Sequence, residues 1–202
     1  MIAIIDYGVG NLASVQKAFE FIGSEAVITK ERAVLVKASH VVLPGVGAFF
    51  EAMKRLKAAG MDKVTGEVIN NNVPLLGICL GMQLLLDMST EGGIESKGLG
   101  TLPGKVDIFP EGMGLKIPHM GWNSIDINKQ SRLLKGLPDN PYVYFVHSFY
   151  CKAVNREDVA AVSNYGIEFD AACEKGNIFA TQFHPEKSGD IGLQILKNFA
   201  AI

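Results

Sequence analysis

The sequence has few cysteines, a single tryptophan and almost no net charge. Its 3 cysteines are an odd number and include no Cys-x-x-Cys pair, which argues against a disulfide scaffold and a structural zinc site. This cysteine usage fits a reducing compartment, so we expect a cytoplasmic protein. The formal net charge of -2 gives no electrostatic reason to expect nucleic acid or an anionic membrane surface as a partner.

Long hydrophobic runs are also absent. A transmembrane helix needs roughly 18 or more consecutive apolar residues. The most apolar stretch, Leu75–Leu86, is interrupted by Gln83 and by glycines. The first residues, Met1–Asp6, contain neither a basic leader nor a small-residue cleavage site. The sequence therefore predicts no membrane span and no secretory signal.

The composition that is present suits a folded protein with a core, because 48% of the 202 residues are hydrophobic. We predict one α/β domain over residues 1–202. Strand-like and helix-like segments alternate in the first half, which predicts a mainly parallel sheet. The predicted strands are Ile2–Asp6, Ala26–Thr29, His40–Leu43 and Pro74–Ile78. One predicted helix begins at Leu12, after Asn11 as an N-cap, and two more cover Phe49–Ala59 and Leu80–Met88.

The second half of the chain has a different pattern, with strand-like segments and few helices between them. The predicted strands are Lys105–Phe109, Trp122–Ile127, Tyr142–His147, Val159–Asn164 and Ile178–Phe183. They indicate an antiparallel or mixed extension of the same sheet. A last helix follows Ser188, a possible N-cap, with Ile191, Ile195 and Phe199 on its apolar face.

Cys79 lies between two glycines where a predicted strand meets a predicted helix, in the run Gly77-Ile78-Cys79-Leu80-Gly81. This is the nucleophile-elbow pattern with Cys in the place of Ser. The sharp turn lifts the side chain above the sheet, the glycines avoid Cβ clashes, and the helix N-terminus favours a thiolate. The amide of Leu80 is then free to bind an oxyanion. The pentapeptide alone fits a small buried, non-reactive Cys79 equally well.

His184 and Glu186 end another predicted strand, in the run Gln182-Phe183-His184-Pro185-Glu186. A cysteine nucleophile needs a base, and the base needs a carboxylate that orients it. These two residues supply both groups, and Pro185 stiffens the link between them. A lone histidine is usually structural, but together with Cys79 the pair favours catalysis. No histidine or acidic residue has metal-ligand spacing, so we predict no metal and no cofactor.

Two glycine-rich turns follow predicted strands. Residues Leu43–Phe49 would lie at the carboxyl end of a parallel strand, where α/β sites form, and their amides could complete an oxyanion hole. Taken alone, this segment is a plain turn. Residues Gly8–Ala13 fit a relaxed dinucleotide fingerprint, with Glu31 near the position of an acidic ribose ligand. We do not favour that interpretation, because short glycine patterns recur by chance and it leaves Cys79 and His184 unexplained.

Together, Gly77–Gln83 and His184–Glu186 resemble the motifs of the class I, or triad, glutamine amidotransferase family. Within it the chain is similar to the glutaminase subunits of imidazole glycerol phosphate synthase. This similarity covers essentially the whole chain and rests on Asp6–Leu12, Leu43–Phe49, Pro118–Asn123, Tyr144–Tyr150 and His184–Gly189. The resemblance implies a three-layer, flavodoxin-like α/β fold with a mainly parallel central sheet and an antiparallel extension.

The resemblance also implies an activity and a partner. Such a subunit hydrolyses glutamine to glutamate and ammonia. The cyclase subunit HisF, a (β/α)8 barrel bound in a heterodimer, uses the ammonia to convert PRFAR to imidazole glycerol phosphate and AICAR in histidine biosynthesis. The implied roles are catalysis by Cys79, His184 and Glu186, oxyanion binding by Val46, Gly47 and Leu80, and glutamine binding by Gln83, Ser148 and Phe149.

Trp122 is the only tryptophan and a possible anchor for such a partner. It could also be a core aromatic residue, but tryptophan is enriched at binding hot spots and this one falls between predicted strands. Asn11 and Lys187 lie in predicted loops at strand ends, so we expect them on the same face.

Three other functions stay open. The same glutaminase could serve a different acceptor, as in pyridoxal phosphate synthase, although the Pro44–Gly47 loop and the Trp122 segment speak against it. A cysteine hydrolase or peptidase could use a similar elbow. A binding or regulatory subunit could keep the fold without turnover, although intact Cys79, His184 and Glu186 argue against that.

Overall fold

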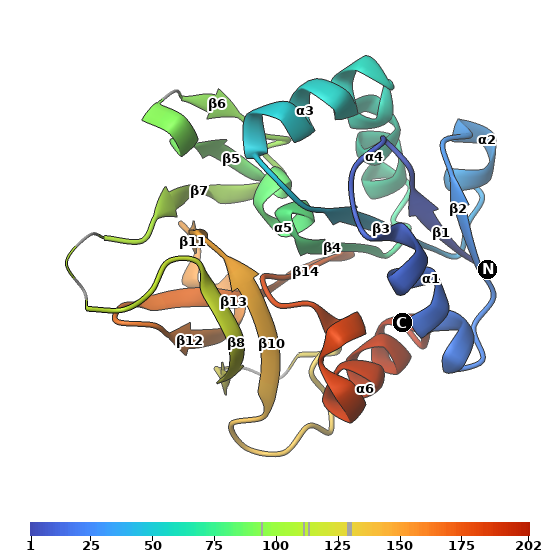
Figure 1. The fold of residues 1–202 in the computed structure, drawn as a ribbon. Helices are drawn as coiled ribbons and strands as arrows, with labels where there is room; N and C mark the ends of the chain where they lie inside the picture. Colours follow the sequence, from blue (N-terminus) through green and yellow to red (C-terminus); the bar gives the residue numbers. More distant parts are fainter. Residues whose placement is uncertain (94, 111, 113, 129–130) are drawn as a thin grey trace.

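The computed structural model describes residues 1–202 apart from 94, 111, 113 and 129–130. The centre of the fold is the parallel part of the main sheet, whose strand order is β2-β1-β3-β4-β14 (Figure 1). These strands are β1 (Ile2–Ile5), β2 (Ala26–Thr29), β3 (His40–Gly45), β4 (Leu75–Cys79) and β14 (Ile178–Thr181). The predicted α/β class with a mainly parallel central sheet is confirmed.

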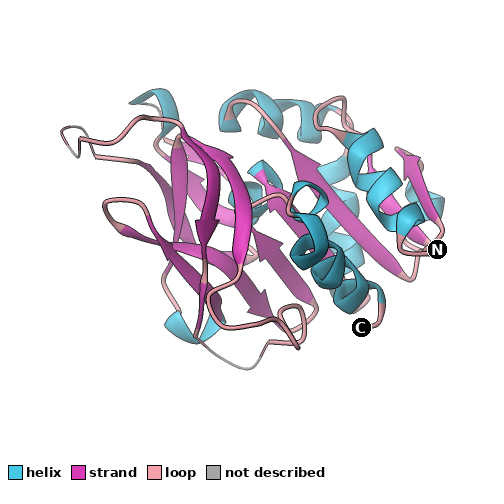
Figure 2. Cartoon of the chain, turned by 60° about the horizontal axis from the view of Figure 1, so that its bottom comes forward, coloured by secondary structure: helices cyan, strands magenta, loops and turns pink. Residues whose placement is uncertain are grey.

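Helices cover both faces of this sheet and make three layers (Figure 2). One face packs against α1 (Leu12–Phe21) and α6 (Gly189–Ala200), and the other against α2 (Arg32–Leu35), α3 (Phe49–Ala58) and α4 (Met61–Asn70). Strand β1 shows why helices pack on both faces. Its residues are all buried, and because side chains alternate along a strand, Ile4 joins the core beside α1 and α6 while Ile5 joins the core beside α3 and α4.

The main sheet continues beyond β14 as an antiparallel extension, to the left in Figure 1. Its strands are β13 (Glu168–Lys175), β11 (Phe149–Ala153), β7 (Leu102–Ile108), β5 (Leu86–Ser89) and β6 (Ser96–Lys97). Strand β12 (Val159–Asn164) pairs with β13, and β9 (Asp126–Ile127) pairs with β12. Among the described residues of this extension, only β5 and β7 pair in parallel. Strands β8 (His119–Ser124) and β10 (Tyr142–His147) form a separate antiparallel pair. The predicted antiparallel extension is thus confirmed.

Short 3-10 turns complete the described part of the chain: η1 (Glu91–Gly93), η2 (Arg156–Asp158) and η3 (Pro185–Lys187). No helix among the described residues is long and apolar enough to cross a membrane.

The helix predicted over Leu80–Met88 is wrong in its last turn. Helix α5 covers only Leu80–Leu85, and the chain continues as strand β5, which pairs with β7. The carbonyl groups of Leu86 and Asp87 accept hydrogen bonds from Gly100 and Gly98 rather than from a following helical turn. Pairing with a distant strand therefore overrides the local helical pattern.

Other boundaries differ for similar reasons. Strand β3 does not stop at Leu43 but continues to Gly45, because Pro44 and Gly45 stay in register with β4. The sequence patterns did not predict α4, β11 or β13. Asn11 and Ser188 occupy the expected N-cap positions, but neither side chain makes a capping hydrogen bond.

Candidate active site

Cys79 stands at a sharp turn between β4 and α5. Its backbone angles, φ 54 and ψ -110, lie outside the usual regions for a residue with a side chain. The flanking glycines allow this turn to pack closely. A Cβ on Gly77 would lie 2.8 Å from Leu85 Cδ1, and one on Gly81 would overlap the carbonyl group of Leu43 in β3. The elbow geometry expected from the sequence is present.

His184 and Glu186 form a buried pair just beyond the end of β14. His184 Nδ1 lies 2.8 Å from Glu186 Oε1, and both side chains are almost fully buried. The backbone of His184 is fixed as well, since its amide donates to the Tyr144 carbonyl and its own carbonyl accepts from the Ser188 hydroxyl. The carboxylate therefore sets the orientation of the imidazole ring and requires the proton on Nδ1.

The charge state of His184 follows from its neighbours. Burial lowers its pKa, but the interactions with the Cys79 and Glu186 side chains outweigh burial and raise that pKa to about 10. The ring therefore takes up a second proton readily at neutral pH, and its charged form is stable beside a Cys79 thiolate. Its Nε2 atom is buried and makes no hydrogen bond within the described part of the chain, so it is available to a reacting group.

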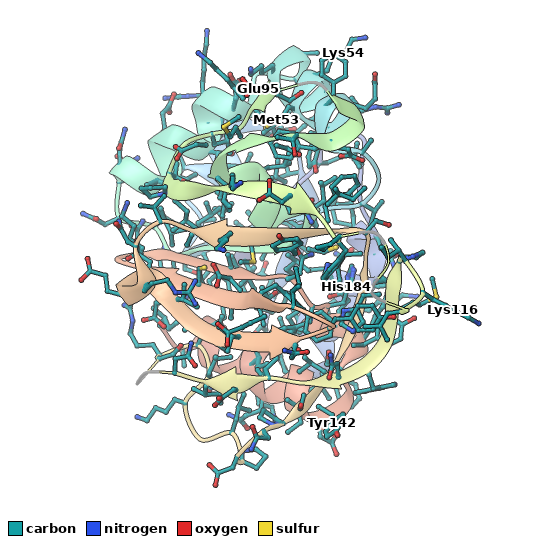
Figure 3. All side chains as sticks on the ribbon, turned by 90° about the vertical axis from the view of Figure 1, so that its left-hand side faces the viewer. Met53, Lys54, Glu95, Lys116, Tyr142 and His184 are labelled. Atoms are coloured by element: carbon teal, nitrogen blue, oxygen red, sulfur yellow. The ribbon has the colours of Figure 1, made fainter. Side chains whose placement is uncertain are left out.

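A cavity of about 360 Å³ joins most of the predicted site residues. The predicted residues among its lining are Val46, Gly47, Cys79, Leu80, Gln83, Ser148, Phe149, His184 and Lys187. Glu186 lies behind His184, and Asn11 and Trp122 do not line the cavity. Figure 3 labels His184, which lies where the strands in the middle of the view end.

The glycine loop after β3 lies beside the elbow. Gly45, the last residue of β3, is the register partner of Cys79, and a Cβ on Gly45 would lie 2.9 Å from that of Leu80. The next residues, Val46 and Gly47, reach the cavity, and Gly47 has a φ of 92. The loop therefore lines the same cavity as Cys79, and oxyanion binding by its amides stays a prediction.

Sequence patterns missed some of the cavity lining, namely Glu91, Pro118, Val146 and His147. Glu91 lies in η1, and its Oε2 accepts a hydrogen bond from the amide of Phe49 at the start of α3. No local motif marks it, because its place depends on the pairing of β5 with β6 and β7.

His147 belongs to a chain of hydrogen bonds that ends at the Phe149 carbonyl. That carbonyl can only accept, so His147 Nδ1 donates to it over 2.8 Å, and His147 Nε2 accepts from His119 Nδ1 over 2.9 Å. Asn123 approaches the remaining nitrogen of His119 at 3.4 Å. Burial lowers the pKa of His119 to about 4 and that of His147 to about 3, so both rings are neutral. These hydrogen bonds hold the main chain in place at Phe149, a residue that the sequence analysis assigned to glutamine binding.

Trp122 lies inside strand β8, paired with Tyr144 of β10, so its predicted place between strands is wrong. It is 55% exposed, so the alternative of a core role is wrong as well. It packs edge-on against Tyr144, and the Lys187 ammonium lies 6.0 Å from the centre of the same Tyr144 ring. Asn11 is exposed at the start of α1, which contacts η3, the turn that carries Lys187. The predicted docking residues thus lie on adjacent exposed elements, and their role stays a prediction.

Among the described residues, no group of three or more His, Cys, Asp or Glu side chains is placed to hold a metal ion. No disulfide bond joins the cysteines of the described part of the chain.

The chain matches the family model described as glutamine amidotransferase class-I over residues 3–202. It is 53% identical over 204 residues to the imidazole glycerol phosphate synthase subunit HisH of Geobacter metallireducens, a match that covers 98% of this chain and 97% of the relative. It is 51% identical to the corresponding subunit HisH 1 of Campylobacter jejuni, with full coverage of both chains.

Solved structures support the fold. A structure described as a glutamine amidotransferase superimposes with a TM-score of 0.75 and 19% identity, covering 99% of this chain and 100% of the other. PurLQS from Thermotoga maritima gives a TM-score of 0.76 at 16% identity, covering 99% and 97%. At these identities the likeness concerns the fold alone.

Proposed function

Because this chain belongs to the class-I glutamine amidotransferase family, we propose that it is the glutaminase subunit of an imidazole glycerol phosphate synthase, acting in histidine biosynthesis. The observation that carries the chemistry is the convergence of Cys79, His184 and the Val46–Gly47 loop on one cavity. The acceptor is inferred from relatives about half identical over nearly their full length, which are named as HisH subunits.

The reaction begins at the sulfur atom of Cys79. The thiol proton passes to His184 Nε2, and the thiolate attacks the side-chain carbonyl carbon of glutamine. His184 then gives its proton to the departing ammonia, and the same nitrogen takes a proton from the water that hydrolyses the thioester. Throughout the reaction, Glu186 accepts the hydrogen bond from the Nδ1–H group of His184 and stabilises the charged imidazolium. The products are glutamate and ammonia, and Cys79 is regenerated.

Negative charge develops on the carbonyl oxygen of glutamine in both tetrahedral intermediates. The amide of Leu80 is the first of α5 and has no partner within its own helix. Together with an amide of the Val46–Gly47 segment it would bind this oxyanion. Removing one such donor costs about 10²–10³ in rate.

The far end of the cavity suits the amino-acid end of glutamine. Ser148 and Phe149 offer main chain there, and Gln83 projects from α5 beside them. Both amide hydrogens of Gln83 are already used, on the carbonyl of Phe149 and on Gln182, so its oxygen is the group left for substrate. The Glu91 carboxylate at the same cavity would pair with the substrate ammonium.

The ammonia would pass to a cyclase subunit, HisF in the relatives' assembly, bound as a heterodimer. Trp122, Lys187 and Asn11 lie on exposed elements beside the cavity and would contact it. Tryptophan and tyrosine are both enriched at hot spots, and Trp122 packs against Tyr144 here.

The experiment compares Cys79→Ala with Cys173→Ala, a buried cysteine that does not line the cavity. Cys79→Ala should abolish glutamate release from glutamine yet keep the fold, and its complex with the cyclase should still form imidazole glycerol phosphate when ammonia is supplied. Cys173→Ala should retain glutamine-dependent turnover. Glutamine hydrolysis by Cys79→Ala, or turnover with the acceptor of pyridoxal phosphate synthase instead, would contradict the proposal.

A further inference from the structure

Gln182 is a completely buried polar side chain directly beneath the nucleophile. It follows β14 and precedes His184 by two residues, yet none of the roles assigned above uses it. Its Nε2 atom donates a hydrogen bond to Cys79 Sγ over 3.7 Å. Its Oε1 atom faces Gln83 Nε2 at 3.0 Å and the Cys151 thiol at 3.7 Å.

The orientation of this amide is dictated by its surroundings. The carbonyl of Phe149 can only accept, so the group that Gln83 presents to it over 3.2 Å must be its NH2. The same NH2 group faces Gln182, which must therefore offer its oxygen. Burial raises the pKa of the Cys151 thiol well above its ordinary value, so this thiol keeps its proton and also donates to that oxygen. The NH2 group of Gln182 is thereby directed at Cys79.

Such a donor adds to the positive charge of protonated His184, because the other groups near the sulfur do little to favour a thiolate. Helix α5 has only 6 residues, so the field at its N-terminus is weaker than that of a long helix. The carbonyl oxygen of Val146 lies 3.9 Å from Sγ, where it accepts from the thiol and repels the thiolate. In the described part of the chain, Gln182 is the residue whose side-chain amide donates to this sulfur.

We propose that Gln182 stabilises the thiolate of Cys79 and holds it at the attack position, through an amide whose direction is fixed by Phe149 and Gln83. When the S–H bond breaks, the proton passes to His184 Nε2 and the electron pair remains on sulfur, which accepts the Gln182 N–H bond. This inference rests on the proposed function, since it takes Cys79 as the nucleophile.

The test is the rate of alkylation of Cys79 by iodoacetamide in the full chain, followed by mass spectrometry and compared between parent and Gln182→Met. Methionine is of similar length but cannot donate. We expect alkylation at about neutral pH to slow by about tenfold, the low end for a hydrogen bond to a charged group. At about pH 10, where an ordinary cysteine thiol is ionised, the two rates should converge. The assay needs neither glutamine nor a partner, so it can fail independently of the proposed function.

Cys151→Ala is the matched control, because it removes only the longer contact to Gln182 Oε1. Gln83 still requires that oxygen to face it, so the donor to sulfur stays in place. Its alkylation profile should equal that of the parent. Equal rates for Gln182→Met and parent at neutral pH would overturn the proposal. So would a slowing of the same factor at both pH values, which would indicate altered access to the sulfur and not a lost donor.

A second measurement avoids any change at Gln182 and covers the case in which Gln182→Met does not fold. In the nuclear magnetic resonance spectrum of the parent, the side-chain amide signals of Gln182 should shift when Cys79 is replaced by Ala. Those of Gln16 and Gln194, which bond to Ala26 and Asn198 far from the site, should not. Unmoved Gln182 signals would refute the contact.

Discussion

Replacing Gly81 by Ala should destabilise the protein, although the residue lies in a helix where alanine is normally preferred. Gly81 is the second residue of α5, and its Cα faces the carbonyl group of Leu43 in the neighbouring strand β3. A Cβ at this position would overlap that carbonyl oxygen, at a distance well below 3.0 Å. Real Cβ atoms essentially never approach another heavy atom that closely. The obstacle is main chain in the β3–β4 ladder, so no change of rotamer can remove it.

The magnitude follows from two opposing terms. Alanine gains about 1 kcal/mol of helix propensity over glycine. Overpacking in a well-packed interior costs typically about 1–3 kcal/mol and occasionally more. Because the overlap is with fixed backbone, the cost should exceed that range, and we expect a net loss of about 3 kcal/mol. For a chain of this size, that lowers the melting temperature by about 6–12 °C.

Gly66→Ala is the matched control for the same substitution. Gly66 lies inside α4, and a Cβ there would meet nothing within 4 Å. This variant should gain about 0.5–1 kcal/mol. Urea unfolding followed by circular dichroism, with thermal melts beside it, measures both. If Gly81→Ala were as stable as the parent, α5 would have to move freely against β3, and the close-packing explanation of the elbow would be refuted.

Three further predictions concern docking, control and pH. Trp122→Ala should weaken association with the cyclase by about 2 kcal/mol or more without lowering the melting temperature, because the side chain is exposed; titration calorimetry showing normal affinity would contradict this. The free chain should release glutamate slowly. Cyclase plus acceptor nucleotide should raise this rate at least about 10²-fold, because an amide at Gly47 turns toward the oxyanion. Equal rates of glutamate release with and without them would exclude such a switch. Because His119 and His147 have lowered pKa values of about 4 and about 3, the unfolded chain binds protons that the folded chain does not. The free energy of unfolding should therefore fall by up to about 1.4 kcal/mol per pH unit for each ring as the pH drops from about 6.5 toward those values, and His147→Gln should flatten this slope in urea titrations.

The parts of the site that were predictable are those encoded in short runs of sequence. Cys79 is marked by its flanking glycines, and His184 with Glu186 by adjacency at a strand end. Both signals are local, because a tight turn or a two-residue spacing already determines where the side chains point. The strands at Ala26–Thr29 and Val159–Asn164 were likewise predictable from their own composition.

The remainder depends on pairings between distant segments. His147 meets His119 only because β10 and β8 pair in a register that places them opposite one another. Glu91 reaches the cavity only because residues 86–89 leave the helical pattern and join β7. Gln182 stood inside a recognised motif, but its role could not be read without the positions of Phe149 and Gln83.

The pairing of β4 with β14 has a consequence for how tolerant this catalytic apparatus is to change elsewhere. Ile78 and Thr181 are register partners in adjacent parallel strands, and the nucleophile and the base follow one and three residues later. The separation of these two residues is thus determined by the distance between neighbouring strands, about 4.8 Å. This distance is common to all β-sheets and does not depend on particular side chains. Substitutions and insertions in helices and surface loops away from the β4–α5 turn leave that spacing unchanged. Engineering of new acceptors or partners can therefore concentrate on the periphery while the reacting pair stays in place.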